Sequence, residues 1–229
     1  MPAATPRFTA GTLSFLRRLK RNNHREWFGA HRDEYERHVR QPMIAVIDRL
    51  AVDMRAIAPE LLVSPKHSMY RIYRDVRFSE NKQPYKTNVA ASFRPRNLPK
   101  GEGAGMYFHL SPEGVWVGGG MYAPQTPQLH LVRERIAANS RRFRAILSAA
   151  SFRRTLGALG GERLQRVPRG FAKDHEAAEY LMHRQFLAGR EFPAAFATSP
   201  KFYGGLLAVF RDLAPLIRFL NEPMLSRLP

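Results

Sequence analysis

The sequence predicts an α+β fold, with a mostly antiparallel sheet in the middle of the chain packed by N-terminal and C-terminal helices. Before about residue 60 and after residue 124, apolar residues recur every three or four positions, the period of a one-sided helix. Between these regions the period falls toward two, as in a strand with one buried face. The short turn Ser111-Pro112-Glu113-Gly114 joins two such segments and favours an antiparallel hairpin.

Three helices are expected before residue 60. The first presents apolar residues on one side, namely Phe8, Leu13, Leu16 and Leu19. It ends at Asn22-Asn23, and a second helix begins at once because Asn23-His24-Arg25-Glu26 has the N-cap and acidic third position of a capping box. Pro42 suits the first turn of a third helix, which runs to Pro59.

Four segments alternate as strands do: residues 69–77, 88–93, 105–110 and 115–121. Gly118-Gly119-Gly120 indicates a bulge or a close backbone approach rather than a long regular strand. The run from Leu98 to Gly103 is expected to be a surface loop. The four alternating segments are expected to form the central sheet.

The helical period returns after Pro124 and Pro127. An Arg-rich loop over residues 163–173 leads to Asp174, which is expected to cap a helix running through Met182. A long amphipathic helix covers about residues 200–220. Without an internal repeat or a long linker, residues 1–229 are expected to form one domain, with flexible ends at about 1–7 and 222–229.

The composition excludes several classes of chemistry. The chain has no cysteine, which removes disulfides, thiolate catalysis and iron–sulfur clusters. Its eight histidines show no i, i+4 pair around a glutamate, so neither a metal site nor a cofactor is expected. No window approaches the ~20 apolar residues of a membrane span, and no apolar leader follows the first methionine. We expect a cytoplasmic protein without a membrane partner.

The net charge of +18 is concentrated in the middle of the chain. Residues 123–173 contain 11 basic and 2 acidic residues, and residues 66–122 contain 9 basic and 4 acidic residues. Residues 174–229 are balanced, with 6 of each. A local excess of this size attracts phosphate-bearing partners, such as nucleic acid or a phosphorylated small molecule.

The most informative stretch runs from residue 71 to residue 87. On a strand, Arg71, Asp75 and Arg77 would share one face, where one guanidinium could bind Asp75 and leave another for an outside anion. A second stretch, residues 163–175, combines a Pro-Arg-Gly-Phe turn with an expected helix start and could form half of a phosphate cradle. The predicted anion-binding residues are Arg71, Arg74, Asp75, Arg77, Ser79, Lys82, Tyr85, Lys86, Arg169, Asp174 and His175.

Both stretches have a structural alternative. The Arg–Asp pair could brace the edge of the sheet, and the second stretch could be a capped loop with Phe171 inserted into the core. Gly101-Glu102-Gly103 and the glycine run 118–120 lack the strand and helix context of a phosphate-binding loop or a dinucleotide fingerprint. No pair of neighbours supports nucleophilic hydrolysis, and the catalytic residues of any reaction stay unknown.

Several ordered motifs of this chain resemble the bacterial and fungal family of conserved hypothetical proteins catalogued as domain of unknown function 2461. The resemblance spans about residues 8–220, and it departs from the family where Arg169 replaces the usual lysine before Gly-Phe. The resemblance identifies the family, but it implies no activity because none is assigned to the family. The motifs are Asn22-Asn23 with 25–28, residues 74–79 with Lys82 and 84–87, residues 107–111 with 118–120, residues 133–136, and residues 166–171 with Asp174-His175.

Three functions follow in order of preference. The first is binding of a phosphate-bearing anion or nucleic acid through a basic sheet face. The second is a structural or protein-interaction module in which the charge reflects composition and solvation. The third is an enzyme acting on a small phosphorylated substrate. Shape separates these classes, because a deep pocket favours a small ligand and an open basic band favours nucleic acid.

Overall fold

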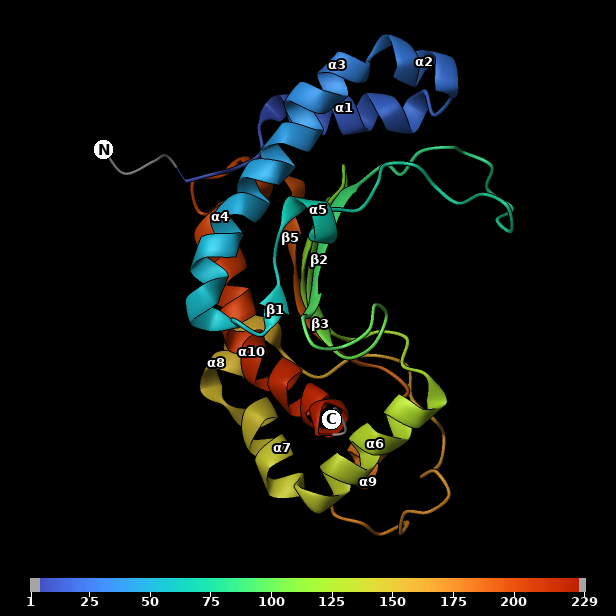
Figure 1. Cartoon of the computed structure of the whole chain (residues 1–229), viewed down its shortest axis with the longest axis vertical. Coiled ribbons are helices and arrows are strands. Elements are labelled where there is room, and N and C mark those ends of the chain that lie inside the picture. Colours follow the sequence, from blue (N-terminus) through green and yellow to red (C-terminus); the bar gives the residue numbers. More distant parts are fainter. Residues whose placement is uncertain (1–4, 227–229) are drawn as a thin grey trace.

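The structure, a computed structural model, describes residues 5–226 and contains a five-stranded antiparallel sheet in the order β1-β2-β3-β4-β5 (Figure 1). The strands are β1 (Leu61–Leu62), β2 (Val89–Pro95), β3 (Gly105–Leu110), β4 (Gly114–Met121) and β5 (Phe186–Pro193). Helices precede and follow the sheet in the chain, so the predicted α+β class and the place of the sheet are confirmed. Residues 1–4 and 227–229, part of the ends predicted to be flexible, lie outside the described residues.

The N-terminal helices follow the predicted order, with one π-helical turn that was not predicted. They are α1 (Ala10–Arg21), α2 (Arg25–Ala30), α3 (Arg32–Tyr35), the π-helix η1 (Glu36–Arg40), α4 (Gln41–Ile57) and α5 (Pro65–Ser68). Asn22 ends α1, and its side-chain amide donates to the Arg18 carbonyl at 2.9 Å. The prediction of Asn23 as the cap of α2 is wrong: His24 is the N-cap, because the Asn23 amide is engaged elsewhere, at Tyr85.

The predicted strand over residues 69–77 is wrong. Met69 forms an isolated bridge with Ala91 of β2, after which the chain leaves the sheet and pairs with its own return arm. The Arg74 amide donates to the Pro84 carbonyl at 2.9 Å, and the Lys86 amide donates to the Ile72 carbonyl at 2.8 Å. Pro84 has no amide hydrogen with which to extend this pairing. The alternating pattern therefore belongs to a projecting loop and not to a strand of the sheet.

Two strands were not expected from the pattern. β5 pairs with β4 along its whole length, yet Gly189, Arg190 and Glu191 interrupt its apolar alternation. β1 has only two residues. Conversely, the glycine run 118–120 does not interrupt β4, which pairs with β3 and β5 through all three glycines. Here the close backbone approach occurs without a bulge.

The C-terminal half supplies the helices that cover the core. They are α6 (Thr126–Ala138), α7 (Ser140–Ser148), α8 (Ala150–Leu156), α9 (Ala178–Leu181), the 3-10 helix η2 (Ala194–Thr198) and α10 (Phe202–Leu225). The long helix predicted at about residues 200–220 is confirmed and continues to Leu225, with Pro215 and Pro223 inside it. Residues 222–225, which were predicted to be flexible, belong to this helix.

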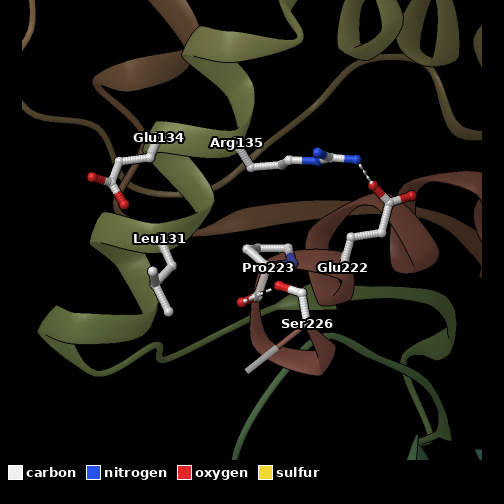
Figure 2. A pocket seen from close by; sticks show the side chains of 6 residues that line it. All are labelled: Leu131, Glu134, Arg135, Glu222, Pro223 and Ser226. Carbon is white, nitrogen blue, oxygen red and sulfur yellow. Dashed lines mark hydrogen bonds and ion pairs between the residues drawn. The ribbon is translucent and has the colours of Figure 1, made fainter. Parts of the chain in front are cut away.

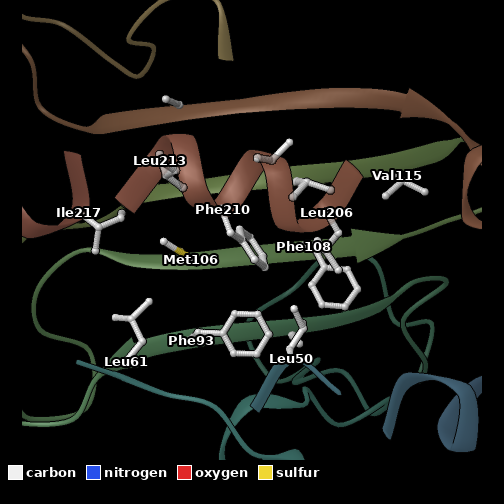
Figure 3. Packing of buried hydrophobic residues seen from close by; sticks show 14 of the residues in the cluster. Leu50, Leu61, Phe93, Met106, Phe108, Val115, Leu206, Phe210, Leu213 and Ile217 are labelled. Atoms are coloured by element: carbon white, nitrogen blue, oxygen red, sulfur yellow. The ribbon is translucent and has the colours of Figure 1, made fainter. Parts of the chain in front are cut away.

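The core lies between α10 and one face of the sheet. Phe210 of α10 meets Phe93 of β2 edge-on, with ring centroids 5.7 Å apart. Figure 3 shows the apolar side chains of α10 directed toward those of β2 and β3, including Phe93, Met106, Phe108, Leu206, Phe210, Leu213 and Ile217. Among the described residues, no helix has both the length and the apolar content required to cross a membrane.

Candidate functional site

The face of the sheet opposite α10 carries a cluster of ring-bearing side chains. In the register of β2, β3, β4 and β5, His109 lies opposite Trp116, and Tyr107 lies opposite Gly118, which pairs in turn with Gly189. Paired residues point to the same side of an antiparallel sheet. In Figure 1 this face lies on the open side of a C-shaped outline, between the long loop before β2 and helix α6.

Glycine makes room for the tryptophan. A Cβ atom on Gly118 would lie 2.7 Å from Cη2 of Trp116, and a Cβ atom on Gly189 would lie 2.5 Å from its Cζ2. Both distances are too short for real contacts, so the indole ring occupies the space above the two glycines. The half-buried Trp116 ring thus lies across β4 and β5 as a broad apolar surface.

Tyr107 connects this surface to the chain before β2. Its ring centroid is 5.8 Å from that of Trp116, 5.6 Å from that of His109 and 6.1 Å from that of Tyr70. The Lys86 ammonium lies 5.1 Å from the Tyr70 centroid, within the range of a cation–π contact. We call Tyr70, Tyr107, His109 and Trp116 the aromatic face.

Burial keeps Tyr107 and His109 of the aromatic face neutral. It raises the pKa of Tyr107 to about 12, and nearby Tyr70 adds to the rise. Burial also lowers the pKa of His109, whereas the nearby Glu191 carboxylate acts in the opposite direction. The His109 Nδ1 atom is buried and has no hydrogen-bond partner among the described residues. At neutral pH the face therefore offers uncharged rings and a tyrosine hydroxyl that can donate a hydrogen bond.

A projecting loop, residues 70–88, adjoins the aromatic face, and we call it the basic loop (Figure 1). Its base is fixed to the N-terminal helices. The Asn23 side chain donates to the Tyr85 carbonyl and accepts from the Tyr85 amide, both at 3.0 Å. The buried Tyr85 ring stacks on Phe28, with centroids 4.2 Å apart. Tyr85, predicted to contact an anion, instead anchors the loop.

The other predicted residues of the basic loop lie at its surface. Lys86 donates to the Arg71 carbonyl at 3.0 Å, and burial together with repulsion from Arg71 lowers the pKa of Lys86. Lys82 donates to the Val76 carbonyl at 3.1 Å. Arg74 donates to the Ser79 hydroxyl at 3.3 Å. Within the described structure, none of these cations is paired with a carboxylate.

Asp75 and Arg77 form the expected ion pair, which is held by two side-chain hydrogen bonds. Arg77 Nε lies 3.0 Å from Oδ1 of Asp75, and its Nη2 lies 2.7 Å from Oδ2. These hydrogen bonds hold the pKa of Asp75 below its usual range. The side chains are 47% and 76% exposed, respectively, so solvent screens the pair. It does not brace a sheet edge, since the loop has left the sheet at this point.

Because the pair is exposed, replacing Asp75 by alanine is expected to leave the thermal unfolding midpoint nearly unchanged. Asn23→Ala is the informative comparison, since it removes both hydrogen bonds at the base of the loop and should lower the midpoint clearly. Differential scanning calorimetry of the two variants measures this. A larger loss in Asp75→Ala than in Asn23→Ala would restore the brace interpretation.

The second predicted stretch lies elsewhere. The chain between α8 and α9, which carries Arg169, Asp174 and His175, runs along the end of the molecule opposite the basic loop in Figure 1. The two stretches therefore do not build one pocket. The predicted cap is also wrong: α9 has four residues and begins after Ala177, and His175 Nδ1 accepts from the Ala177 amide at 3.0 Å. Phe171 packs partly buried against the core, as in the structural alternative.

Several arginines of residues 123–173 bind partners within the same molecule. Arg133 is buried and donates to the His183 carbonyl at 2.9 Å. Arg135 and Arg142 share the Glu222 carboxylate, and Arg144 binds Glu176 at 2.8 Å. Both glutamates come from the segment that appears balanced in the sequence. The excess positive charge of residues 123–173, which we call the basic band, is therefore smaller at the surface than the residue count indicates.

A cavity of about 480 Å³ lies between α6 and the end of α10 (Figure 2). Its lining residues are Leu131, Glu134, Arg135, Glu222, Pro223 and Ser226. Figure 2 shows Arg135 directed at Glu222, which neutralises it. With two carboxylates against one guanidinium, this cavity does not favour an anion. Within the described part of the chain, no cluster of three or more histidine, aspartate or glutamate side chains could hold a metal ion.

Sequence reasoning missed the aromatic face. The available signal was the alternation in residues 106–110 and 115–117, which places Tyr107, His109 and Trp116 on the side opposite the apolar core. A comparison with curated proteins finds no match. The profile of the family described as "Conserved hypothetical protein (DUF2461)" matches residues 11–219, which include the basic loop and the aromatic face. The chain therefore belongs to this family of conserved hypothetical proteins, DUF2461.

Proposed function

We propose that this protein binds single-stranded nucleic acid, with phosphates on the cations of the basic loop and bases on its aromatic side chains and on the aromatic face. One observation carries the proposal. The basic loop exposes Tyr70, Tyr73 and Phe78, and each of them is adjacent in sequence to an arginine, namely Arg71, Arg74 and Arg77.

Exposed aromatic residues interleaved with cations suit this ligand for two reasons. Every base has a π-face that can stack on an aromatic ring, and guanidinium groups neutralise the backbone phosphates between successive bases. Phe78 is 94% exposed and lies beneath the Arg77 guanidinium, 5.8 Å from its ring centroid. A single exposed apolar residue is normal, but Phe78 is one of three exposed aromatic residues on the same loop, with Tyr70 and Tyr73, and this grouping supports a role in contact with a ligand.

The shape of the region supports an extended ligand. The loop projects from the body of the molecule (Figure 1). The ring contacts of Tyr107 with Tyr70 and with Trp116 continue the aromatic face from the base of the loop across the sheet. Tyr70 links the two, because its ring contacts Tyr107 on one side and Lys86 on the other. A single-stranded nucleic acid could follow this path over several nucleotides. The shape therefore matches the open basic surface expected for nucleic acid rather than a deep pocket for a small molecule.

The first test is a fluorescence-anisotropy titration with short single-stranded and double-stranded DNA and RNA over a salt series. We expect tighter binding of single strands, with affinity that falls as salt rises. The double variant Arg74→Ala, Arg77→Ala should bind more weakly. The slope of its log affinity against log salt should be smaller by about 0.7–1.4, which corresponds to one or two lost phosphate contacts on a single strand, because Arg77 is already paired with Asp75.

The matched control is Arg166→Ala, Arg169→Ala, which removes the same charge from the exposed loop at the other end of the molecule. It should retain the wild-type slope. An equal loss in both double variants would move the interface or show that net charge alone drives binding. Absence of binding at low salt would reject the proposal and favour the protein-interaction alternative, with Phe78 as its apolar contact.

A further inference from the structure

A second, smaller site lies where the base of the basic loop meets the N-terminal helices. There, a pocket with a cavity volume of about 210 Å³ opens between α2, α3 and η1 on one side and the first residues of the loop on the other. Its lining residues are Phe28, Arg32, Tyr35, Glu36, Arg40, Arg71, Ile72 and Tyr73. None of these was predicted as a site residue except Arg71.

The charge of the lining favours an anion. The lining contains three arginines and one glutamate, and Arg40 binds the carboxylate of that glutamate, Glu36, at 3.1 Å. Arg32 and Arg71 have no carboxylate within ion-pair distance in the described structure, and they come from opposite walls of the pocket. A guanidinium group can donate two parallel hydrogen bonds to an oxyanion, so two arginines without a carboxylate partner in the lining of a small cavity suit such a ligand.

Two tyrosines add neutral donors. Tyr35 is buried against the core, which raises its pKa to about 12, with further contributions from Glu36 and Tyr73. Its side chain belongs to the lining of the pocket. At neutral pH the group is protonated and can donate to a bound oxygen atom. Tyr73, which is exposed on the loop, supplies a second hydroxyl at the rim.

The backbone at the pocket is unusual. Glu36–Arg40 form a π-helical turn between α3 and α4, and its first and last residues both line the cavity. π-helical turns are rare, and those that occur are frequently found at functional sites. This backbone feature is independent of the charges, and it coincides with them at the same place.

We infer that this pocket binds a phosphate dianion, either inorganic phosphate or the terminal phosphate of a larger ligand. The cavity is smaller than the roughly 300–1,000 Å³ of sites for drug-sized molecules, and it suits a single phosphate group with the rest of the ligand outside. The inference depends on the pocket's own residues and does not require the proposed function. Arg71 belongs to both regions, whereas Arg32 belongs to the pocket alone.

The test is thermal unfolding in increasing sodium phosphate, with sodium chloride at matched ionic strength as the reference. Wild-type protein should show a rise in Tm above the chloride reference that follows RT ln(1 + c/Kd), where c is the phosphate concentration, and that is roughly 3–6 °C at a phosphate concentration about ten times Kd. Arg32→Ala and Arg71→Ala should each raise Kd at least about tenfold, as expected when a charge-assisted hydrogen-bonding partner is removed. Arg37→Ala is the matched control, because Arg37 is an exposed arginine of the same π-turn that does not line the pocket.

The control should bind phosphate with the wild-type Kd. Absence of a rise in Tm above the chloride reference, or a rise that is equal in all four proteins, would overturn the inference. An anisotropy titration with strands carrying a 5′-phosphate or a 5′-hydroxyl then separates the two sources. A preference for the phosphorylated end that disappears in Arg32→Ala assigns the pocket to the end of a strand, and equal affinity assigns it to a free phosphate compound.

The same experiments keep this inference apart from the proposed function. A phosphate-specific rise in Tm that Arg32→Ala weakens, without nucleic-acid binding, would reject the proposed function and support the pocket. Nucleic-acid binding with no rise in the Tm of the wild-type protein above the chloride reference would support the basic loop and overturn the pocket.

Discussion

Replacing Trp116 by alanine is expected to weaken single-strand binding roughly 5- to 150-fold, because one stacked base contributes about 1–3 kcal/mol. The indole ring lies across Gly118 and Gly189, so it presents its broad side along the sheet instead of packing into the core. Its removal leaves two glycines, which have no side chain to replace the lost surface. The affinity should be measured by anisotropy at constant salt.

Two further variants make this prediction specific. Trp116→Phe keeps a ring at the same position and should recover much of the affinity. Tyr122→Ala removes an exposed ring just beyond the end of β4 that makes no ring contact with the aromatic face, and it should bind as the wild type does. If Trp116→Ala and Tyr122→Ala behaved alike, the aromatic face would not be the surface on which bases stack.

Replacing Asn221 by alanine is expected to lower the free energy of unfolding by about 2–5 kcal/mol, since a buried donor and a buried acceptor would lose their partner. Asn221 is 2% exposed within α10, where its Oδ1 accepts from the Ala104 amide at 2.7 Å and its Nδ2 donates to the Ala104 carbonyl at 3.0 Å. Ala104 immediately precedes β3, so the amide fixes the start of that strand to the long helix. Urea unfolding followed by circular dichroism gives the value.

Asn81→Ala provides the reference for this second variant. Asn81 lies in the exposed part of the basic loop and accepts a hydrogen bond only from the Gln83 amide, at 3.0 Å. Its replacement should change stability little, since water can take the place of the lost partner. Similar unfolding curves for Asn221→Ala and Asn81→Ala would show that Asn221 is not needed to hold α10 against the sheet.

The sequence could predict those elements whose burial is one-sided and regular. The long C-terminal helix and strands β2, β3 and β4 have apolar residues on a single face, and that face packs in the core. The segment 69–77 has the same alternation, but Phe78, which continues it, is 94% exposed. Alternation reports side-chain character along the chain, and it cannot show whether a partner strand is present. β5 illustrates the reverse, since Arg190 and Glu191 lie in a strand whose pairing is complete.

The candidate site could be predicted only in part, for a related reason. The cations of the basic loop are adjacent in sequence, and so are the aromatic residues between them. The contacts that give the loop its place are not local: Asn23 and Tyr85 are 62 residues apart, and the Arg135–Glu222 pair spans 87 residues. Segment charge counts therefore overestimated the basic band, because its neutralising partners lie far along the chain.

The pair of hydrogen bonds between Asn23 and the Tyr85 backbone also affects how recognition would divide along the basic loop. Ordering a flexible segment costs conformational entropy, and a ligand that contacts an already ordered segment avoids that cost. The anchored base can therefore impose a fixed geometry on whatever it contacts. The tip beyond Val76, held by fewer contacts, can adapt to the partner, so selectivity would reside near the helices and tolerance near the tip.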